Sequence, residues 1–532
     1  MKETLRIDCV FITLCLFGLA LISQLVSIQI IQGEKYRAWA EGRLFLQEGK
    51  LGERGEIFFK NGESLAINKN FFSVFASPAE VKNPEKTADI LSQILDLPRD
   101  FIAEKLKKGS GLYSPIKNRI SDTEVKNVEK AELAGIHIKQ ERGRYFPQET
   151  LASQLVGFVD ADSQGQYGLE GYYNDVLIGR DGKKGQDLNL TIDYDIQFFA
   201  EKLLKENGQN LKIEKGVILV LEPASGKILT LANSPNFNPN FYQDYAQDKK
   251  LEIFQNEAVL SLFEPGSVFK PVTMASALEE GKITPQTTYV DEGVVRIGGY
   301  KILNYDSRVY GEQTMTNVLE KSINTGAVFA ERQLGGDLFL KYIEKFGFFK
   351  KTGIDLNEIY SQNKELKKGY EINFTTAAFG QGVEITLMQL AKAYSVLANG
   401  GKLVTPHLLE DFSQKDSESI ISSKTASQIT SMLVSVVENG FSKAAKVPGY
   451  YIAGKTGTAQ VSFSALGIKK SGYSDKTVQS FVGFFPAFNP KILILVKLDN
   501  PETKTAEYSA LPIFHDLADY IAHLYQIPPD YQ

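Results

Sequence analysis

A serine and a lysine three positions apart, Ser267 and Lys270, are the residues around which chemistry can be built in this chain. Pro265-Gly266 breaks the chain before a run with helical spacing, so Ser267 is expected near a helix N-terminus, where backbone N–H groups favour developing negative charge. Lys270 would project from the same helix face. A buried lysine that loses its proton can make the serine hydroxyl a nucleophile. Partners are needed, because Ser-x-x-Lys also occurs at Ser114–Lys117 and Ser361–Lys364.

Two further motifs can supply those partners. A serine nucleophile needs a proton relay, an amide that orients the substrate, and a cationic strand for a substrate carboxylate and an oxyanion. Ser322-Ile323-Asn324, between helices predicted over 316–320 and 327–334, offers the relay and the amide. Lys455-Thr456-Gly457-Thr458 lies on a strand predicted over 450–461, where glycine marks close approach by a ligand. The predicted catalytic residues are Ser267, Lys270, Ser322, Asn324 and Lys455, and the predicted substrate-binding residues are Thr456, Gly457 and Thr458.

Copies of these motifs occur elsewhere in less suitable contexts. Ser-x-Asn recurs at Ser234–Asn236 and Ser361–Asn363, and Lys-Thr-Gly recurs at Lys351–Gly353, where a helix end capped by Gly353 is predicted. Gly449–Thr456 also fits the phosphate-loop formula G-x-x-x-x-G-K-[ST]. That formula needs a strand before its first glycine and a helix after its lysine, and the flanking residues predict neither. The flanking residues therefore argue against a nucleotide site.

The elements that must position these motifs predict an α+β fold. Residues 44–190 indicate mixed strand and helix, with a hairpin-type turn at Asn61-Gly62 and helices over 87–107 and 122–134. The pattern changes from Asp187. Strands are predicted over 188–192, 217–221, 227–232, 480–486 and 492–498, and helices over 193–204, 386–398, 424–437 and 506–525. Helices flanking a largely antiparallel sheet are typical of the α+β class.

The N-terminus carries a long uncharged run from Cys9 to Gly33. About 20 apolar residues can cross a bilayer, so the run predicts a transmembrane anchor. A cleavable signal peptide is the alternative, and Ala38-Trp39-Ala40 has the shape of a cleavage site. The run is longer than a signal core and charges separate it from that site, which favours an uncleaved anchor. Basic residues flank both ends, so charge does not set the orientation.

Composition limits the remaining possibilities. The chain has 532 residues, which predicts two to four domains, and its net charge of -5 gives no case for nucleic-acid binding. The four histidines form no metal-ligand cluster, and the two cysteines both lie in the N-terminal apolar run. We therefore expect no zinc site and no disulfide framework.

With the three motifs in this order, the chain resembles the class B penicillin-binding proteins, the monofunctional membrane-anchored peptidoglycan D,D-transpeptidases. The resemblance extends to segments outside the motifs and runs from the anchor to about residue 525. The matching segments are Arg54-Gly55, Gly168–Glu170, Leu190–Asp193, Val220–Lys227, Phe379–Gly382, Asn399–Gly401, Gly454–Gln460 and Ser480–Phe484. Phe58-Phe59-Lys60 departs from the usual aspartate-containing stretch before Asn61-Gly62. Within the family, the layout is more similar to the division (septal) type.

The resemblance implies a mechanism. Ser267 would attack the penultimate D-alanine carbonyl of a stem peptide while Lys270 takes its proton, and backbone N–H groups of Ser267 and Thr458 would form the oxyanion hole. Ser322 would pass a proton to the departing D-alanine, and Asn324 would orient the peptide. Lys455, Thr456 and Thr458 would bind the terminal carboxylate. An amine from a neighbouring strand would then resolve the acyl-enzyme. No metal or organic cofactor would be needed.

The resemblance also implies an organisation and a set of partners. Residues 1–8 would form a cytoplasmic tail, 9–31 the transmembrane anchor, 32–190 a pedestal or dimerisation domain, and 191–532 the transpeptidase domain. The protein would be single-pass in the plasma membrane, with its catalytic domain extracytoplasmic. Its partners would be peptidoglycan stem peptides, β-lactams as covalent inhibitors, a membrane glycosyltransferase of the shape-elongation-division-sporulation family and other division proteins.

Three alternatives share the motifs. A wall-elongation transpeptidase would use the same chemistry at another place in the cell. A β-lactamase would need an efficient deacylating base, and no carboxylate stands within the three motifs; Glu384, near Gly380–Gly382, is not expected to serve. A membrane-bound β-lactam sensor would need a cytoplasmic signalling part, whereas about eight residues precede the apolar run.

Overall fold

The structure is a computed structural model. It describes residues 17–18, 21–22, 24–25, 52–78, 80–107, 113–180, 182–247, 251–414 and 417–531. Most of the anchor predicted over 9–31 therefore lies outside the described residues. Within the described residues, no helix has the length and apolar character needed to cross a membrane. Contacts divide the chain into two compact units: one comprises Met1–Gly55 with Asp175–Asp187, and the other comprises Glu56–Asn174 with Leu188–Gln532.

In the smaller unit, backbone contacts join residues 52–55 to Leu177, Gly179 and Gly185. The Gly55 N–H donates to the Leu177 carbonyl at 2.8 Å, and the Gly185 N–H donates to the Glu53 carbonyl at 2.7 Å. Gly52 forms an isolated bridge with Gly179. A Cβ at Gly55 or Gly185 would come within 2 Å of backbone, so close chain approach explains these glycines.

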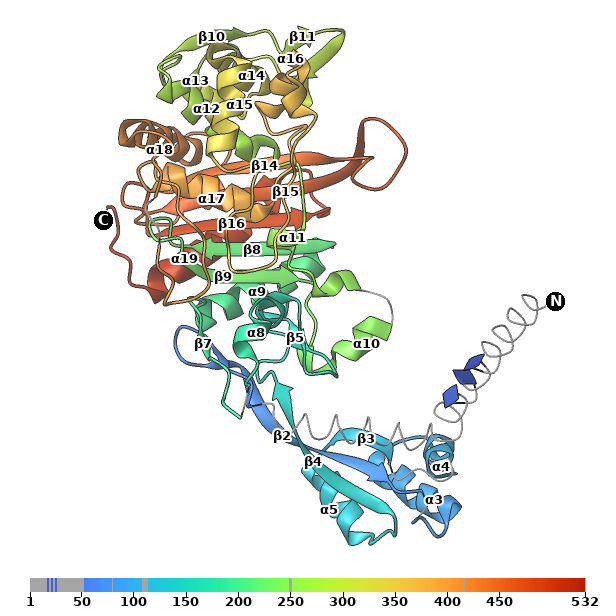
Figure 1. Cartoon of the computed structure of the whole chain (residues 1–532). Helices are drawn as coiled ribbons and strands as arrows, with labels where there is room; N and C mark the ends of the chain where they lie inside the picture. Colours follow the sequence, from blue (N-terminus) through green and yellow to red (C-terminus); the bar gives the residue numbers. More distant parts are fainter. Residues whose placement is uncertain are drawn as a thin grey trace, which may run out of the picture. The chain divides into compact units, whose positions relative to one another are not determined.

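The N-terminal part of the larger unit is built on a long strand, β2 (Ser64–Ala76), which pairs with β1 (Ile57–Phe58), β3 (Ser114–Ile120) and β4 (Ile136–Tyr145) (Figure 1). Strand β1 also pairs with β7 (Leu188–Asn189). The helix predicted over 87–107 is two helices, α3 (Pro84–Leu95) and α4 (Arg99–Lys107). Asp96 ends α3 in the left-handed conformation, and Pro98 follows before α4 begins. Helix α5 covers Asp122–Lys130.

The C-terminal part is organised around a five-stranded antiparallel sheet in the order β14-β15-β16-β8-β9 (Figure 1). The strands cover Ala453–Ser462, Tyr473–Phe485, Ile492–Asp499, Lys215–Leu221 and Ile228–Ser234. Helices α9 (Tyr194–Asn210) and α19 (Ala510–Leu524) share one apolar core with the sheet. Helix α17 (Leu387–Ala398) packs on β16, and α18 (Ser423–Glu438) packs on β14. This part is a sheet flanked by helices, as the sequence predicted.

A helical region next to β14 carries two of the three motifs. Ser267 lies on η4 (Gly266–Phe269), which continues into α12 (Lys270–Glu279). Helices α13 (Met315–Glu320) and α14 (Asn324–Leu334) are separated by Lys321–Ile323, a shorter break than the predicted 321–326. Helix α15 covers Gly336–Lys345, so the prediction that Gly353 caps a helix is wrong: that helix ends eight residues earlier and Gly353 lies in a loop.

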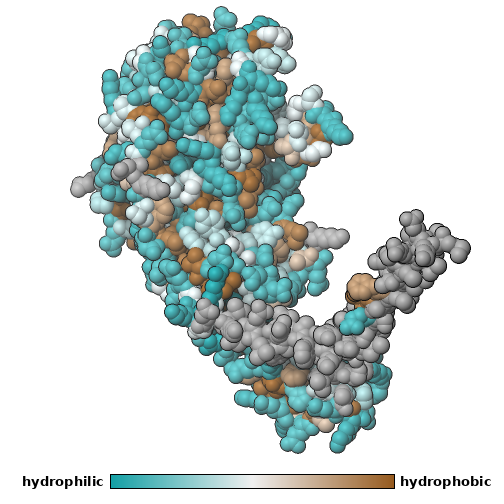
Figure 2. All heavy atoms as spheres, viewed as in Figure 1, coloured by the Kyte–Doolittle hydropathy of each residue, from teal (hydrophilic) through white to brown (hydrophobic). Residues whose placement is uncertain are grey.

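Short elements complete the described chain. They are β5 (Phe158–Val159), β6 (Gly165–Gln166), β10 (Thr288–Asp291), β11 (Val294–Ile297), β12 (Tyr300–Leu303), β13 (Gly311–Thr314), α6 (Ser153–Val156), α7 (Gly168–Tyr172), α8 (Asn174–Leu177), α10 (Tyr242–Gln247), α11 (Glu257–Leu260), α16 (Glu371–Ala377), η2 (Pro239–Phe241), η3 (Leu251–Phe254), η5 (Tyr305–Ser307), η6 (Leu366–Lys368), η7 (Lys443–Ala445) and η8 (Ala506–Tyr508). The face shown in Figure 2 is largely hydrophilic, consistent with apolar residues gathered in the buried cores.

Candidate active site

Short backbone contacts fix the position of Ser267. Gly266 has φ +61° and its N–H donates to the Gly380 carbonyl at 2.9 Å. A Cβ at Gly380 would lie 2.1 Å from the Gly266 carbonyl oxygen, so only glycine permits this approach. From α17, the hydroxyl of the fully buried Tyr394 donates to the Val268 carbonyl at 2.7 Å. The turn that carries the serine is therefore held from two sides.

Lys270 is fully buried, and its amine contacts the predicted nucleophile and the Ser322 motif together. Its Nζ lies 3.0 Å from Ser267 Oγ, 2.6 Å from the Ser322 carbonyl oxygen, 3.2 Å from Ser322 Oγ and 2.8 Å from Asn324 Oδ1. The carbonyl and amide oxygens can only accept hydrogen bonds. A neutral amine would donate its two N–H groups to them and leave its lone pair for the Ser267 hydroxyl. This arrangement can activate Ser267.

The break between α13 and α14 positions Ser322 and Asn324. Ser322 adopts φ +53°, a left-handed conformation that is uncommon for a non-glycine residue and is often found at functional sites. Asn324 is the first residue of α14, and its Nδ2 donates to the Leu303 carbonyl at 2.9 Å while its Oδ1 accepts from Lys270. These two contacts fix the direction of the amide.

Lys455 joins the third motif to the other two. Its Nζ donates to Ser322 Oγ at 3.0 Å and to the Thr456 carbonyl at 3.1 Å. A Cβ at Gly457 would lie 2.6 Å from Ser480 Oγ and 3.0 Å from the Pro265 carbonyl oxygen, so glycine allows β14 to pack directly against η4. Thr458 Oγ1 accepts a hydrogen bond from the Ala506 N–H at 3.2 Å.

Burial lowers the pKa of both lysines at the site. Burial, and secondarily the positive charge of Lys455, hold the pKa of Lys270 well below its usual value. Burial also lowers the pKa of Lys455 to about 7. Both amines therefore favour the neutral form more than an exposed lysine does. A neutral Lys270 is the state that a general base needs.

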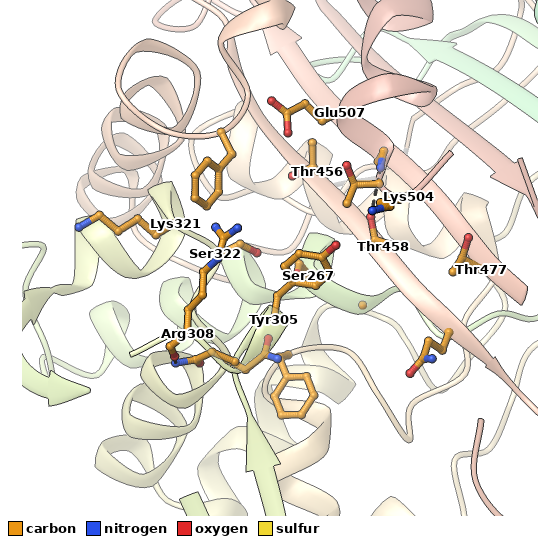
Figure 3. A pocket seen from close by; sticks show the side chains of 18 of the residues that line it. Ser267, Tyr305, Arg308, Lys321, Ser322, Thr456, Thr458, Thr477, Lys504 and Glu507 are labelled. Carbon is orange, nitrogen blue, oxygen red and sulfur yellow. Dashed lines mark hydrogen bonds between the residues drawn. The ribbon is translucent and has the colours of Figure 1, made fainter. Parts of the chain in front are cut away.

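These groups open onto a cavity of about 850 Å³ (Figure 3). In this view Ser267 lies between Ser322 on one side and Thr458 on the other. The cavity is lined by Ser267, Ser322, Asn324, Thr456 and Thr458 from the motifs, whereas Lys270 and Lys455 lie beneath its wall. Every residue of the predicted site is therefore at the cavity or in contact with a residue that lines it.

Sequence reasoning missed a buried network that supports this wall. Asn304 Nδ2 and Thr325 Oγ1 donate to Asp291, at 2.9 and 2.6 Å. The Thr325 N–H donates to Asn304 Oδ1 at 3.1 Å, next to Asn324 in α14. Burial acts to raise the pKa of Asp291, but hydrogen bonds from Thr325, from the Gly293 and Tyr310 amides and from Asn304 hold it below its usual value. No motif spacing marks these residues, which meet only through the fold.

Charged residues at the cavity were also missed. Arg308, Lys321, Lys504 and Glu507 line it, and all four are labelled in Figure 3. Glu384, which the sequence did not favour as a deacylating base, is exposed and does not line the cavity. It accepts a hydrogen bond from Ser361 Oγ at 3.3 Å. A sequence pattern could not single out Glu507, because isolated carboxylates outside a motif are common.

The motif copies that were set aside lie away from this cavity. Ser114 is on β3 and donates to the Lys105 carbonyl, and Thr352 of the second Lys-Thr-Gly donates to Glu358. The phosphate-loop alternative fails because the residues after Lys455 continue β14 instead of beginning a helix. Among the described residues, no group of three or more His, Cys, Asp or Glu side chains could hold a metal ion.

Comparison with known proteins places this geometry in a family. Residues 50–191 match the penicillin-binding protein dimerisation domain, and residues 216–519 match the penicillin-binding protein transpeptidase domain. Stage V sporulation protein D of Bacillus subtilis is 32% identical, over 92% of this chain and 81% of that protein. A Mesostigma viride protein named Peptidoglycan D,D-transpeptidase FtsI homolog is 27% identical, over 96% of this chain and 94% of that protein.

A solved structure agrees with both matches. The crystal structure of penicillin-binding protein 3 from Mycobacterium tuberculosis, complexed with aztreonam, aligns with a TM-score of 0.69 at 25% identity, covering 90% of this chain and 98% of that chain. The fold and site thus define a penicillin-binding transpeptidase. With its dimerisation and transpeptidase modules, the chain belongs to the class B penicillin-binding proteins.

Proposed function

We propose that this protein cross-links peptidoglycan stem peptides by D,D-transpeptidation through an acyl-enzyme on Ser267. The observation that carries this proposal is the fully buried Lys270 amine, which lies 3.0 Å from Ser267 Oγ and contacts Ser322 and Asn324 in the same site. Burial and a nearby cation favour the neutral amine, which can take the serine proton. The relatives' names, which include a peptidoglycan D,D-transpeptidase, support the reaction class.

In this proposal each motif has one task. Ser267 attacks the penultimate D-alanine carbonyl, Lys270 receives its proton, and Ser322 returns a proton to the departing D-alanine. The two lysine amines lie 3.2 and 3.0 Å from Ser322 Oγ, which supports a relay through that hydroxyl. Asn324 orients the peptide at the cavity wall. The Ser267 and Thr458 amides stabilise the oxyanion, and no metal or organic cofactor takes part.

The substrate's terminal carboxylate would bind along β14. Thr456 and Thr458 line the cavity and Lys455 lies behind them, so these residues would hold the carboxylate while Gly457 keeps the strand close to Ser267. A β-lactam would enter in place of the donor and form a slowly hydrolysed ester. The structure of the mycobacterial relative with aztreonam supports this second reaction.

We further propose the cellular setting. Residues 1–8 would be cytoplasmic, 9–31 would span the plasma membrane once, and the pedestal (32–190) and transpeptidase (191–532) domains would be extracytoplasmic. The partners would be a glycosyltransferase of the shape-elongation-division-sporulation family and other division proteins, at the septum. Similarity to Stage V sporulation protein D, whose name places it in sporulation, gives a competing setting, and wall elongation gives another. If a fluorescent fusion of this protein localises to the lateral wall or to spores instead of the septum, the septal assignment is rejected.

The reaction itself is tested with nascent glycan strands that carry pentapeptide stems. The full-length protein is expected to produce cross-linked muropeptides after muramidase digestion, with one D-alanine released for each cross-link. Ser267→Ala is expected to produce none. Rapid turnover of penicillin without cross-links would instead indicate a β-lactamase, and a stable penicillin adduct without cross-links would indicate a sensor.

A further inference from the structure

The cavity extends past the three motifs to the loop that follows β16. Lys504–Tyr508 contribute to its wall, and Glu507, on η8, is the one carboxylate among the described residues that line it. No described residue forms a hydrogen bond or ion pair with this carboxylate. The other charged lining residues, Arg308, Lys321 and Lys504, are cations. Glu507 is thus an unpaired anion in an otherwise cationic cavity.

The loop around Glu507 is held firmly against the site. The Ala506 N–H donates to Thr458 Oγ1 at 3.2 Å. On β15, the fully buried Gln479 accepts hydrogen bonds from Thr503 Oγ1 at 2.8 Å and from Ser509 Oγ at 2.6 Å. The segment is therefore fixed before, beside and after Glu507. Its attachment to Thr458 ties the position of Glu507 to the strand that would hold the donor.

The second half of the proposed reaction creates a need for such an anion. The acceptor is an amine, and an alkyl amine with a pKa of about 10.4 is almost entirely an ammonium ion at neutral pH. An ammonium ion has no lone pair for attack on the acyl-enzyme. The cations that line the cavity, Arg308, Lys321 and Lys504, repel it, because like charges repel one another.

We propose that Glu507 binds the ammonium group of the acceptor and removes one of its protons. This assignment rests on the proposed transpeptidation. One ammonium proton passes to the Glu507 carboxylate, and the freed nitrogen lone pair forms a bond to the ester carbonyl carbon. The C–Oγ bond to Ser267 then breaks, and Oγ takes the second nitrogen proton through Lys270. The third proton stays on the new amide, and Glu507 releases its proton to solvent.

The test separates acylation from aminolysis in the full-length protein. A D-alanyl thioester serves as the acyl donor and D-alanine as the acceptor, and the amide and the hydrolysed product are measured together. Glu507→Gln is expected to lower the rate of aminolysis by about 10² or more, the lower range for loss of a proton acceptor. Penicillin acylation of Ser267 and hydrolysis of the thioester are expected to stay within about threefold of wild type.

Glu502→Gln is the matched control. Glu502 is on the same loop, is exposed, pairs with Lys212 at 2.9 Å and does not line the cavity, so its substitution should change neither rate. Hydroxylamine, which is already neutral at neutral pH, should react equally with wild type and Glu507→Gln. Unchanged aminolysis of D-alanine in Glu507→Gln would overturn the proposal, as would an equal loss with both amines or an equal loss of hydrolysis. If penicillin does not acylate the wild-type protein, the result would instead contradict the proposed function.

Discussion

Replacing Lys455 by methionine should move the pH dependence of acylation toward higher pH. The Nζ atoms of Lys270 and Lys455 both lie within 3.2 Å of Ser322 Oγ, so they are at most about 6 Å apart. At that distance and an effective dielectric constant of ~20, two positive charges repel by about 3 kcal/mol. Without this repulsion, protonation of Lys270 becomes easier and its pKa rises. Since 1.36 kcal/mol corresponds to one pH unit, the acid limb should move upward by about two pH units.

The assay is stopped-flow acylation by a chromogenic β-lactam from pH 4 to 9. Each profile is normalised to its own maximum, because Lys455→Met should also weaken binding of the β-lactam carboxylate. Thr456→Val is the control, since it alters the same carboxylate site but keeps the Lys455 charge. Its acid limb should coincide with that of wild type. The Lys455 pKa is about 7, so the displacement should be seen below pH 7, where this amine is charged. An unchanged acid limb in Lys455→Met would refute the reasoning.

Three further substitutions test other parts of the site. Lys270→Arg should lower acylation by about 10² or more, because arginine cannot supply a neutral base; circular dichroism checks folding, and a near-wild-type rate would exclude Lys270 as the base. Gly457→Ala should lower the acylation rate by about tenfold or more and the free energy of unfolding by about 1–3 kcal/mol, because the new Cβ would lie 2.6 Å from Ser480 Oγ. Gly208→Ala, where a Cβ meets nothing within 4 Å, is the control in urea unfolding, and equal effects would contradict the packing argument. Asp291→Asn should lower the free energy of unfolding by about 1–3 kcal/mol, because an amide group would face the donors that now bind the carboxylate. Because the native carboxyl has a lowered pKa, this difference in stability from wild type should shrink as pH falls through that pKa. A difference that does not depend on pH would contradict this account.

Much of the fold followed from local pattern. Alternating or continuous apolar runs predicted the strands near 217–221, 227–232, 480–486 and 492–498, and each overlaps a strand of the main sheet. The helix predicted over 87–107 failed because its apolar spacing continues through a break that one residue, Asp96, makes by adopting φ +51°. The predicted cap at Gly353 failed because a positive φ occurs in loops as well as at helix ends.

Motif context was enough to identify which groups would meet. Ser267, Ser322 and Lys455 occupy a helix start, an interhelical break and a strand, and the structure brings all three within reach of the Lys270 amine or its direct partner Ser322 Oγ. The catalytic roles stay predictions. Residues that support or extend the site, such as Asp291 and Glu507, carry no fixed spacing from the motifs. Their importance arises from burial and from the position of a cavity, which are properties of the folded chain.

Identification of the acylated residue tests the central claim most directly. The full-length protein is labelled with a fluorescent penicillin, digested with protease, and the modified peptide is located by mass spectrometry. We expect a single long-lived adduct on Ser267, with no labelling of Ser267→Ala and normal labelling of Ser114→Ala and Ser361→Ala. An adduct on Ser322 or on either of these two other serines, or equal labelling of Ser267→Ala, would contradict the account.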